Sequence, residues 1–199
     1  MSDGVVAGIA RAWRDPRGAM SKMIDEGLNE PRALAHLVAA CFLLLVASLP
    51  NAVREARVVD IEDSLSGVIA AHLFGYMFVL PLVLYGVAAL AHLAARPFGG
   101  SGGYLGARSA LFWTVLAGTP VALALALFGV GAEALSGGAR LPWLSLPGYA
   151  GLAFWIWLYA GALAETEGFA STGRVAAALV AVFGGLAVLT GFLAGGAAG

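Results

Sequence analysis

Five long apolar runs, separated by short polar segments, dominate the pattern of hydrophobic and polar positions along the chain. None of the runs contains Asp, Glu, Lys or Arg, and they extend over 33–49, 67–95, 109–132, 149–164 and from 175 to near the carboxyl end. An α-helix rises about 1.5 Å per residue, so about 20 apolar residues cross a hydrocarbon core of about 30 Å. The pattern predicts an all-α polytopic membrane protein with a bundle of five transmembrane helices.

Prolines interrupt two of these runs and follow a third. Pro81 lies near the middle of 67–95, and Pro120 lies within 109–132. Because proline has no backbone N–H, each of them removes a helical hydrogen bond and predicts a kink. Pro50 comes directly after the first run, and we interpret Pro50-Asn51 as the end of that helix.

The residues before the first run have the pattern of two short amphipathic helices. Apolar side chains recur at helical spacing at Val5, Val6, Ile9 and Trp13, and again at Met20, Met23, Ile24 and Leu28. Asp15-Pro16 is typical of an N-cap followed by proline at the first helical position, and Asn29-Glu30-Pro31 repeats this signal before the first span. We expect the segment to lie in the headgroup layer with its cations toward anionic lipid, the alternative being a solvated tail.

Composition supports a membrane environment and excludes one class of partner. Apolar residues make up 60% of the chain and charged residues 12%, against about 45–50% and about 25% in soluble domains. Net charge is −1 and the basic residues are dispersed, so the electrostatic surface that a nucleic acid requires is absent. Cys41 is the only cysteine, which rules out an intramolecular disulfide, and we expect it to pack among apolar neighbours.

The distribution of Lys and Arg predicts the orientation of the spans. Eight of these residues fall on the side of the amino end, namely Arg11, Arg14, Arg17, Lys22, Arg32, Arg96, Arg108 and Arg174, and three on the other, Arg54, Arg57 and Arg140. Positive residues are retained in the cytoplasm. We therefore expect a cytoplasmic amphipathic segment, 1–32, a five-helix transmembrane domain, 33–199, and a carboxyl end outside. A single lysine beside ten arginines, in a chain rich in alanine and glycine, favours a bacterial inner membrane with a periplasmic carboxyl end.

The ionisable residues offer little catalytic chemistry. Charge-free span centres argue against a proton-coupled transporter or a charge-lined channel. Glu165 and Glu167 are two residues apart and so face different sides of a helix, which favours a solvated helix end over a catalytic pair. The run 99–103 lacks the lysine and Ser/Thr of a phosphate-binding loop and is interpreted as a turn. No serine stands in a nucleophile motif, so we predict no enzyme activity.

Histidines are the remaining candidates for metal or haem ligands. His36 and His92 lie near the cytoplasmic ends of the first two spans, so a shared site is geometrically possible, whereas His72 lies at the opposite end of the second span. One pair without supporting ligands is a weak signal, and histidines at a membrane edge are more often hydrogen-bonded structural residues. We predict no cofactor and no metal.

Several motifs in order along the chain resemble the Yip domain family, five-span membrane proteins named for interaction with Rab-type GTPases. They are WRDPRGAM at 13–20, EPRAL at 30–34, Pro81 with Tyr85-Gly86, the glycine-rich turn that leads into Tyr104, FWTVLAGTP at 112–120, and AETEGFASTGRV at 164–175. The resemblance implies a cytoplasmic amino segment, five bundled helices and no enzymatic activity. Structural or interaction candidates within and beside these motifs are Trp13, Arg14, Arg17, Pro81, Tyr85, Gly86, Gly102 and Pro120. A bacterial member would have no Rab partner.

Two functional hypotheses follow from these features. The first is a scaffold or adaptor in membrane organisation or trafficking, in which 5–28 presents a surface to lipid headgroups or to another membrane or cytoplasmic protein. The alternative is a small permease or transporter subunit for an apolar or uncharged molecule, built around helices that Pro81 and Pro120 interrupt. Polar side chains near those breaks would favour transport, and only Thr119 beside Pro120 fits. The sequence does not define an oligomeric state.

Overall fold

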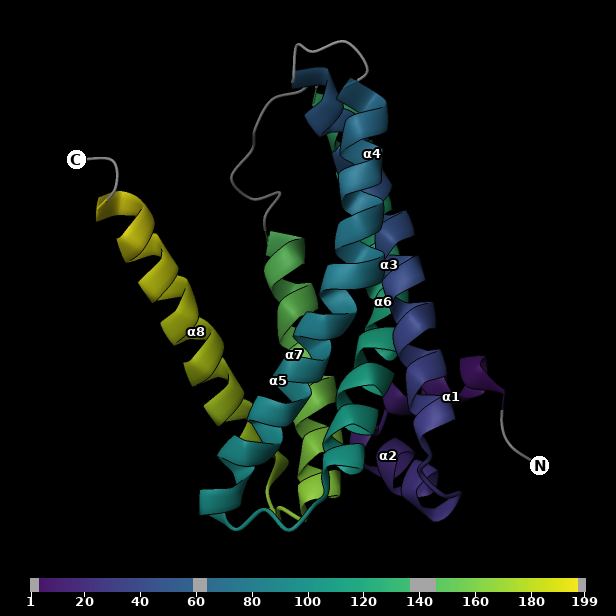
Figure 1. Ribbon diagram of the computed structural model, residues 1–199, viewed down its shortest axis with the longest axis vertical. Helices are drawn as coiled ribbons and strands as arrows, with labels where there is room; N and C mark the ends of the chain where they lie inside the picture. Colours follow the sequence, from purple (N-terminus) through teal and green to yellow (C-terminus); the bar gives the residue numbers. More distant parts are fainter. Residues whose placement is uncertain (1–3, 59–63, 137–145, 197–199) are drawn as a thin grey trace.

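The computed structural model describes residues 4–58, 64–136 and 146–196, and these residues form helices and short turns without strands (Figure 1). The all-α class is thereby confirmed. The elements are α1 Val5–Ala12, α2 Pro16–Asp25, α3 Glu30–Val58, α4 Ser64–Phe74, a π-helical turn Gly75–Val79, α5 Leu80–Ala95, a 3-10 turn Arg96–Phe98, α6 Tyr104–Ser136, α7 Leu146–Glu167 and α8 Thr172–Gly196. The connection that carries Arg140 lies outside the described residues.

Side-chain caps begin two helices at the places that the sequence predicts. The Asp15 carboxylate accepts a hydrogen bond from the Gly18 N–H at 2.9 Å, with Pro16 at the first position of α2. The Asn29 side chain accepts from the Arg32 N–H at 2.9 Å at the start of α3. Each cap satisfies an N–H group that would otherwise have no partner within the helix. The predicted starts of α2 and α3 are thus confirmed.

The prediction that Pro50 ends the first span is wrong, because α3 continues through Pro50 to Val58. An internal proline removes one backbone hydrogen bond, and packing can offset that loss. Here the turn after Pro50 packs tightly, with Ala52 fully buried and Ala56 nearly so, and α3 lies against α4 and α6. Residues 51–58, which lie beyond the predicted end of the first span, therefore extend the helix.

The second span is one long helical rod with a change of helix type next to Pro81. A π-helical turn, Gly75–Val79, separates α4 from α5, and the Leu80 N–H donates to the Gly75 carbonyl five residues back. Turns of this kind add one residue to the helix and occur often at functional sites. The irregularity that the sequence predicts at Pro81 therefore takes the form of a π-helical turn just before it.

Within the described residues, four helical segments have the length and apolar composition of a membrane span: Glu30–Arg57, Leu65–Phe98, Tyr104–Ser136 and Leu146–Glu167. Helix α8 packs against α7 and leans away from the rest of the bundle (Figure 1). Its described apolar part, Thr172–Gly185, is shorter. The chain is a multi-pass membrane protein, and the fifth crossing stays a prediction.

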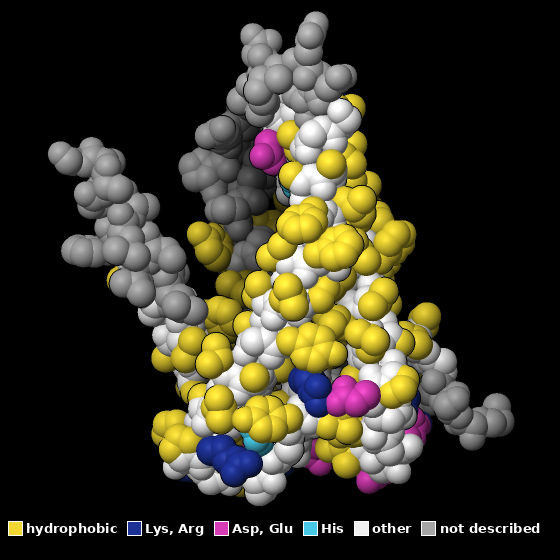
Figure 2. Space-filling view, in the orientation of Figure 1, with side chains coloured by type: hydrophobic (Ala, Val, Ile, Leu, Met, Phe, Trp, Pro, Cys, Tyr) yellow, Lys and Arg dark blue, Asp and Glu magenta, His cyan; other side chains and the backbone are white. Residues whose placement is uncertain are grey.

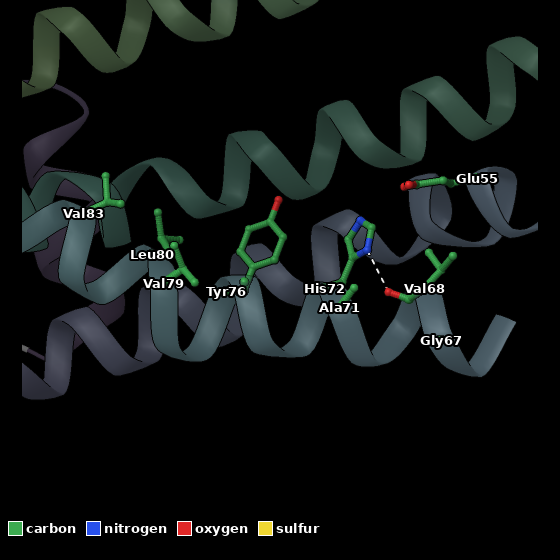
Figure 3. A pocket seen from close by; sticks show the side chains of 10 residues that line it. Glu55, Gly67, Val68, Ala71, His72, Tyr76, Val79, Leu80 and Val83 are labelled. Atoms are coloured by element: carbon green, nitrogen blue, oxygen red, sulfur yellow. Dashed lines mark hydrogen bonds between the residues drawn. The ribbon is translucent and has the colours of Figure 1, made fainter. Parts of the chain in front are cut away.

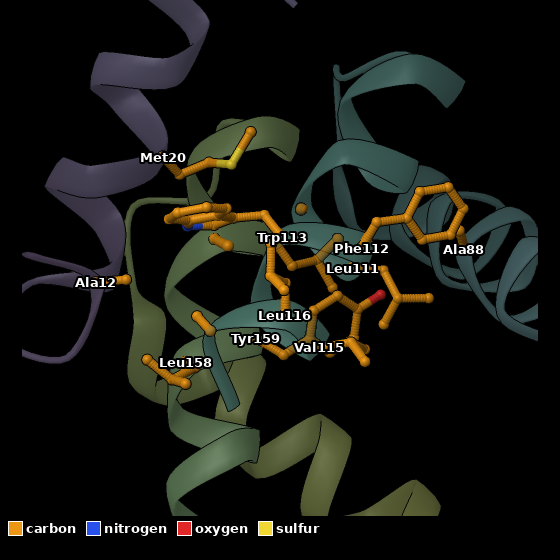
Figure 4. Close-up of a cluster of buried hydrophobic side chains, with 14 of the residues drawn as sticks. Ala12, Met20, Ala88, Leu111, Phe112, Trp113, Val115, Leu116, Leu158 and Tyr159 are labelled. Carbon is orange, nitrogen blue, oxygen red and sulfur yellow. The ribbon is translucent and has the colours of Figure 1, made fainter. Parts of the chain in front are cut away.

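The hydrophobic core occupies the end of the bundle where α1 and α2 pack, called here the α2 end. Its large buried side chains come from α2, α3, α6 and α7, with Leu37 the one from α3. Figure 4 shows Met20, Leu111, Phe112, Leu158 and Tyr159 of this core. Cys41 is also buried there, as expected. On the face seen in Figure 2, hydrophobic side chains cover the length of the bundle, and most charged side chains gather at the α2 end.

Candidate functional site

The carboxyl end of α7 binds two different parts of the chain through its two glutamates. The Arg17 Nε of α2 donates to the Glu165 carboxylate at 2.7 Å, and the same guanidinium donates to the Ala170 carbonyl at 3.2 Å. Glu167 is fully buried, with its Oε1 2.8 Å from the His92 Nδ1 of α5. The two carboxylates face different sides of α7, as their spacing predicts. The interpretation as a solvated helix end is wrong for Glu167, because α5 and the following loop enclose it.

Each side-chain nitrogen and oxygen of the buried His92–Glu167 pair has a hydrogen-bond partner. The second Glu167 oxygen accepts from the Gly102 N–H at 3.2 Å, and the Glu167 carbonyl accepts from the Ser101 N–H at 3.0 Å. With His92 Nδ1 as donor to the carboxylate, Nε2 is left to accept from the Arg96 Nε at 3.5 Å. Such bonding is what allows polar groups to be buried without a large penalty.

The glycine-rich turn 99–103 lies directly against the end of α7. A Cβ atom on Gly102 would lie 2.3 Å from the Thr166 carbonyl oxygen and 2.9 Å from a Glu167 carboxylate oxygen. On Gly100 it would lie 2.9 Å from the Ala95 carbonyl oxygen. These distances are shorter than a van der Waals contact. Positions 100 and 102 therefore need glycine, because the backbone of the turn lies directly against the carbonyl groups of Ala95 and Thr166.

Trp13 joins the amino-terminal segment to α6 beside Pro120. Because Pro120 has no N–H, the Leu116 carbonyl four residues earlier loses its helical donor, and the Thr119 hydroxyl donates to it at 2.8 Å. The neighbouring Ala117 carbonyl accepts from the Trp13 indole N–H at 2.7 Å. Trp13 therefore binds α6 one residue beyond the carbonyl that Pro120 leaves without its helical donor.

We expect Trp13→Phe to loosen α1 and α2 from the bundle while the spans stay folded. Phenylalanine keeps the aromatic contact with Phe154 and loses the indole donor, a change worth about 1 kcal/mol. The measurement is the rate of tryptic cleavage after Arg14 and Arg17 in the purified protein, which should rise several-fold. Trp157→Phe is the matched control, since Trp157 has nearly the same exposure, 37% against 38%. Equal cleavage rates for the two variants would show that the Trp13 bond does not hold the segment.

The amino-terminal helices pack on the bundle through their apolar faces. Met20 is fully buried, and a Cβ atom on Gly161 of α7 would lie 2.7 Å from the Pro16 ring, so α2 sits directly on α7. A Cβ atom on Gly8 would lie 2.9 Å from the Trp113 ring, so α1 approaches α6 as closely. The apolar sides of α1 and α2 that contact α6 and α7 therefore face protein, and the position of the segment in the headgroup layer stays a prediction.

The remaining candidates from the sequence lie apart from one another. The Tyr85 ring packs edge-on against Phe112 at 5.0 Å, and the Arg108 guanidinium, paired with Glu30, lies 5.8 Å from the ring centre. Arg14 is exposed on the surface, Gly86 has open space where a side chain would stand, and Pro81 follows the π-helical turn. The structure brings Arg17 and Gly102 to the end of α7, and Trp13 to Ala117 of α6.

His36 and His92 have different neighbours. The His36 ring lies 5.0 Å from the Trp113 ring, whereas His92 binds Glu167 and lies 4.4 Å from the Tyr104 ring. Among the residues that the structure describes, no three His, Cys, Asp or Glu side chains converge as they would around a metal ion. The signal that sequence reasoning missed was a histidine near the end of the charge-free run 67–95, shortly before the glycine-rich turn, and a glutamate just after the run 149–164, within the resemblance motif 164–175.

Comparison with known proteins identifies one family. The family model described as the Yip1 domain matches residues 10–194, nearly the whole chain. No curated protein and no solved structure matches this chain. The resemblance found in the motifs of the sequence is thereby confirmed, and the match includes both α2 and the end of α7 to which it binds.

Proposed function

Because this chain belongs to the Yip1 domain family, we propose that it is a non-enzymatic scaffold or adaptor in membrane organisation or trafficking. It is an integral membrane protein with several apolar helices. We infer a bacterial inner membrane from the single lysine beside ten arginines and the many alanines and glycines, and a cytoplasmic amino end from the eight-to-three distribution of positive residues. Its proposed partner is another membrane or cytoplasmic protein.

The docked amino-terminal segment is the observation that carries this proposal. Its apolar side packs on α6 and α7, and the Arg17–Glu165 and Trp13–Ala117 bonds fix its orientation. Charged residues on the other side, among them Arg14, Asp25 and Glu26, remain exposed. A rigid, charged surface at the α2 end suits recognition of a protein by complementary charge.

Photo-crosslinking from native membranes tests the proposal. A photoreactive residue at Arg14 or at Asp25 should capture the same protein, because both positions are exposed on the docked segment. The same group at Met20, which is fully buried, is the control and should capture none. This design leaves Met20 in place in the test variants, whereas deleting 1–32 would remove part of the core and confuse loss of partner with loss of stability. Mass spectrometry of the adducts gives the result.

A crosslinking pattern without a recurrent protein would contradict the scaffold and favour the alternative, a small permease for an apolar or uncharged molecule. One observation supports that alternative, since the π-helical turn beside Pro81 gives α4–α5 an irregular segment of the kind that lines transport sites. Against it, Phe78, Val79 and Leu82, around that break, are apolar and exposed. Uptake of uncharged solutes by vesicles with and without the protein separates the two functions.

A further inference from the structure

An open groove lies along α4 and the π-helical turn, away from the α2 end. It has a volume of about 610 Å³, and Glu55 near the end of α3 borders it. Figure 3 shows its lining side chains in a row, from Glu55 through His72 and Tyr76 to Val79, Leu80 and Val83. Polar groups stand at one end and aliphatic groups at the other. An amphiphilic molecule matches that order.

The groove has the dimensions of one membrane leaflet. Arg32 and Glu55 are 23 residues apart in α3, or about 35 Å, so with Arg32 at one surface of a hydrocarbon core of about 30 Å, Glu55 reaches the opposite headgroup layer. From His72 to Val83 the helix descends 11 residues, or about 16 Å, close to half of that core. A headgroup beside Glu55 and His72 would therefore have its acyl chain beside Val79, Leu80 and Val83.

A second, apolar cavity continues the aliphatic end toward the middle of the bundle. Its volume is about 320 Å³, and Leu80 lines both spaces. Its other walls include Leu84, Val115, Leu125 and Trp155, from α5, α6 and α7. A cavity with a predominantly apolar lining favours a hydrocarbon occupant over water. The two spaces together offer room for a headgroup and for at least one chain.

The polar end of the groove presents hydrogen-bond acceptors. The His72 Nδ1 lies 3.0 Å from the Val68 carbonyl, which can only accept, so Nδ1 donates, and in the neutral imidazole Nε2 is the acceptor. Glu55 is exposed, and among the described residues its carboxylate has no Lys or Arg partner, while neighbouring Arg54 pairs with Glu133 at 3.2 Å. A ligand that donates hydrogen bonds and carries positive charge complements these groups.

We propose that this groove binds one membrane lipid with a primary ammonium headgroup, an aminophospholipid. Its ammonium donates to the Glu55 carboxylate and to the His72 Nε2, and its acyl chain lies along Val79, Leu80 and Val83. A quaternary ammonium headgroup has no N–H to donate, and an anionic glycerol headgroup would be repelled by Glu55. The site therefore selects by headgroup and is separate from the partner surface of α1 and α2.

Native mass spectrometry of the purified full chain, given equal amounts of phosphatidylethanolamine, phosphatidylcholine and phosphatidylglycerol, tests the proposal. The wild type should retain one phosphatidylethanolamine in preference to the other two lipids. Glu55→Gln should weaken that retention about tenfold, because a charge-assisted hydrogen bond is lost. Ala71→Leu should abolish it by filling the groove, which Ala71 lines.

Two matched variants separate binding from folding. Ala70→Leu adds the same side chain one residue away, outside the lining residues, and Glu165→Gln removes a carboxylate at the opposite end of the bundle, where it pairs with Arg17. Both should retain the lipid as the wild type does. Equal retention of the three lipids, a preference for phosphatidylglycerol, or the same behaviour of Ala71→Leu and Ala70→Leu would each overturn the proposal. Thermal unfolding of all variants identifies any that are misfolded, and His72→Phe then provides a second test at the headgroup.

Discussion

Glu167→Ala is expected to cost the folded protein about 3–5 kcal/mol, because it removes one partner of a buried pair and leaves the other buried without it. Glu167 and His92 are both fully buried. Without the carboxylate, the His92 Nδ1 and the Gly102 N–H lose their acceptor in a region that water does not reach. The loss would affect α5, the turn 99–103 and α7 together, because all three meet at this side chain.

Denaturant unfolding of the purified protein in detergent measures this cost. Glu165→Ala is the matched control, two residues away on the same helix. Its ion pair with Arg17 is partly exposed, with side-chain exposures of 23% and 37%, so its loss should cost no more than about 1 kcal/mol. Equal losses of unfolding free energy in the two variants would mean that burial does not determine how much each glutamate contributes to stability. Glu167→Gln keeps an acceptor oxygen, so its free energy of unfolding should lie between those of the wild type and Glu167→Ala.

Gly102→Ala is the second substitution with a large expected effect, about 3 kcal/mol, from overpacking and a lost hydrogen bond together. The added methyl group would stand 2.3 Å from the Thr166 carbonyl oxygen. That oxygen belongs to the backbone of α7, which cannot rotate away as a side chain would. The turn must move, and the bond from the Gly102 N–H to Glu167 is lost with it.

The neighbouring glycine provides a control for this prediction. A Cβ atom on Gly103 would meet no atom within 4 Å, so Gly103→Ala should change the unfolding free energy by less than about 1 kcal/mol. The double variant Glu167→Ala/Gly102→Ala should cost less than the sum of the two single changes, because both break the same contact. Full additivity would place the two effects in separate parts of the protein.

The sequence predicted the local features of the fold well, because local patterns determine them. Charge-free runs located the helices, and the side chains of Asp15 and Asn29 cap α2 and α3 where the sequence placed those caps. Pro50 was misinterpreted because tight packing of the following turn carries α3 through it. The sequence predicted an irregularity at Pro81 but not a π-helical turn, since whether the helix kinks or forms such a turn depends on the packing of the backbone around it.

The candidate site was predictable only in part, because its contacts join distant parts of the chain. The resemblance motifs singled out Arg17 and Gly102, but nothing in the sequence paired them with Glu165 and Glu167. His92 and Glu167 lie 75 residues apart in the chain, and only the packing of α5 against α6 and of α6 against α7 brings them together. A helix end followed by glycine is usually solvated, and the enclosure of Glu167 by the turn 99–103 is a tertiary effect.

The bonds that hold α2 have a consequence for how the protein is made. Trp13 is 104 residues from its acceptor on Ala117, and Arg17 is 148 residues from Glu165. The amino-terminal segment leaves the ribosome before the first span, yet its binding surface does not exist until α6 and α7 have been inserted. During synthesis the apolar faces of α1 and α2 are thus uncovered for most of the length of the chain. Their docking is a late assembly step, and a nascent chain that lacks α7 would expose them to chaperones and proteases.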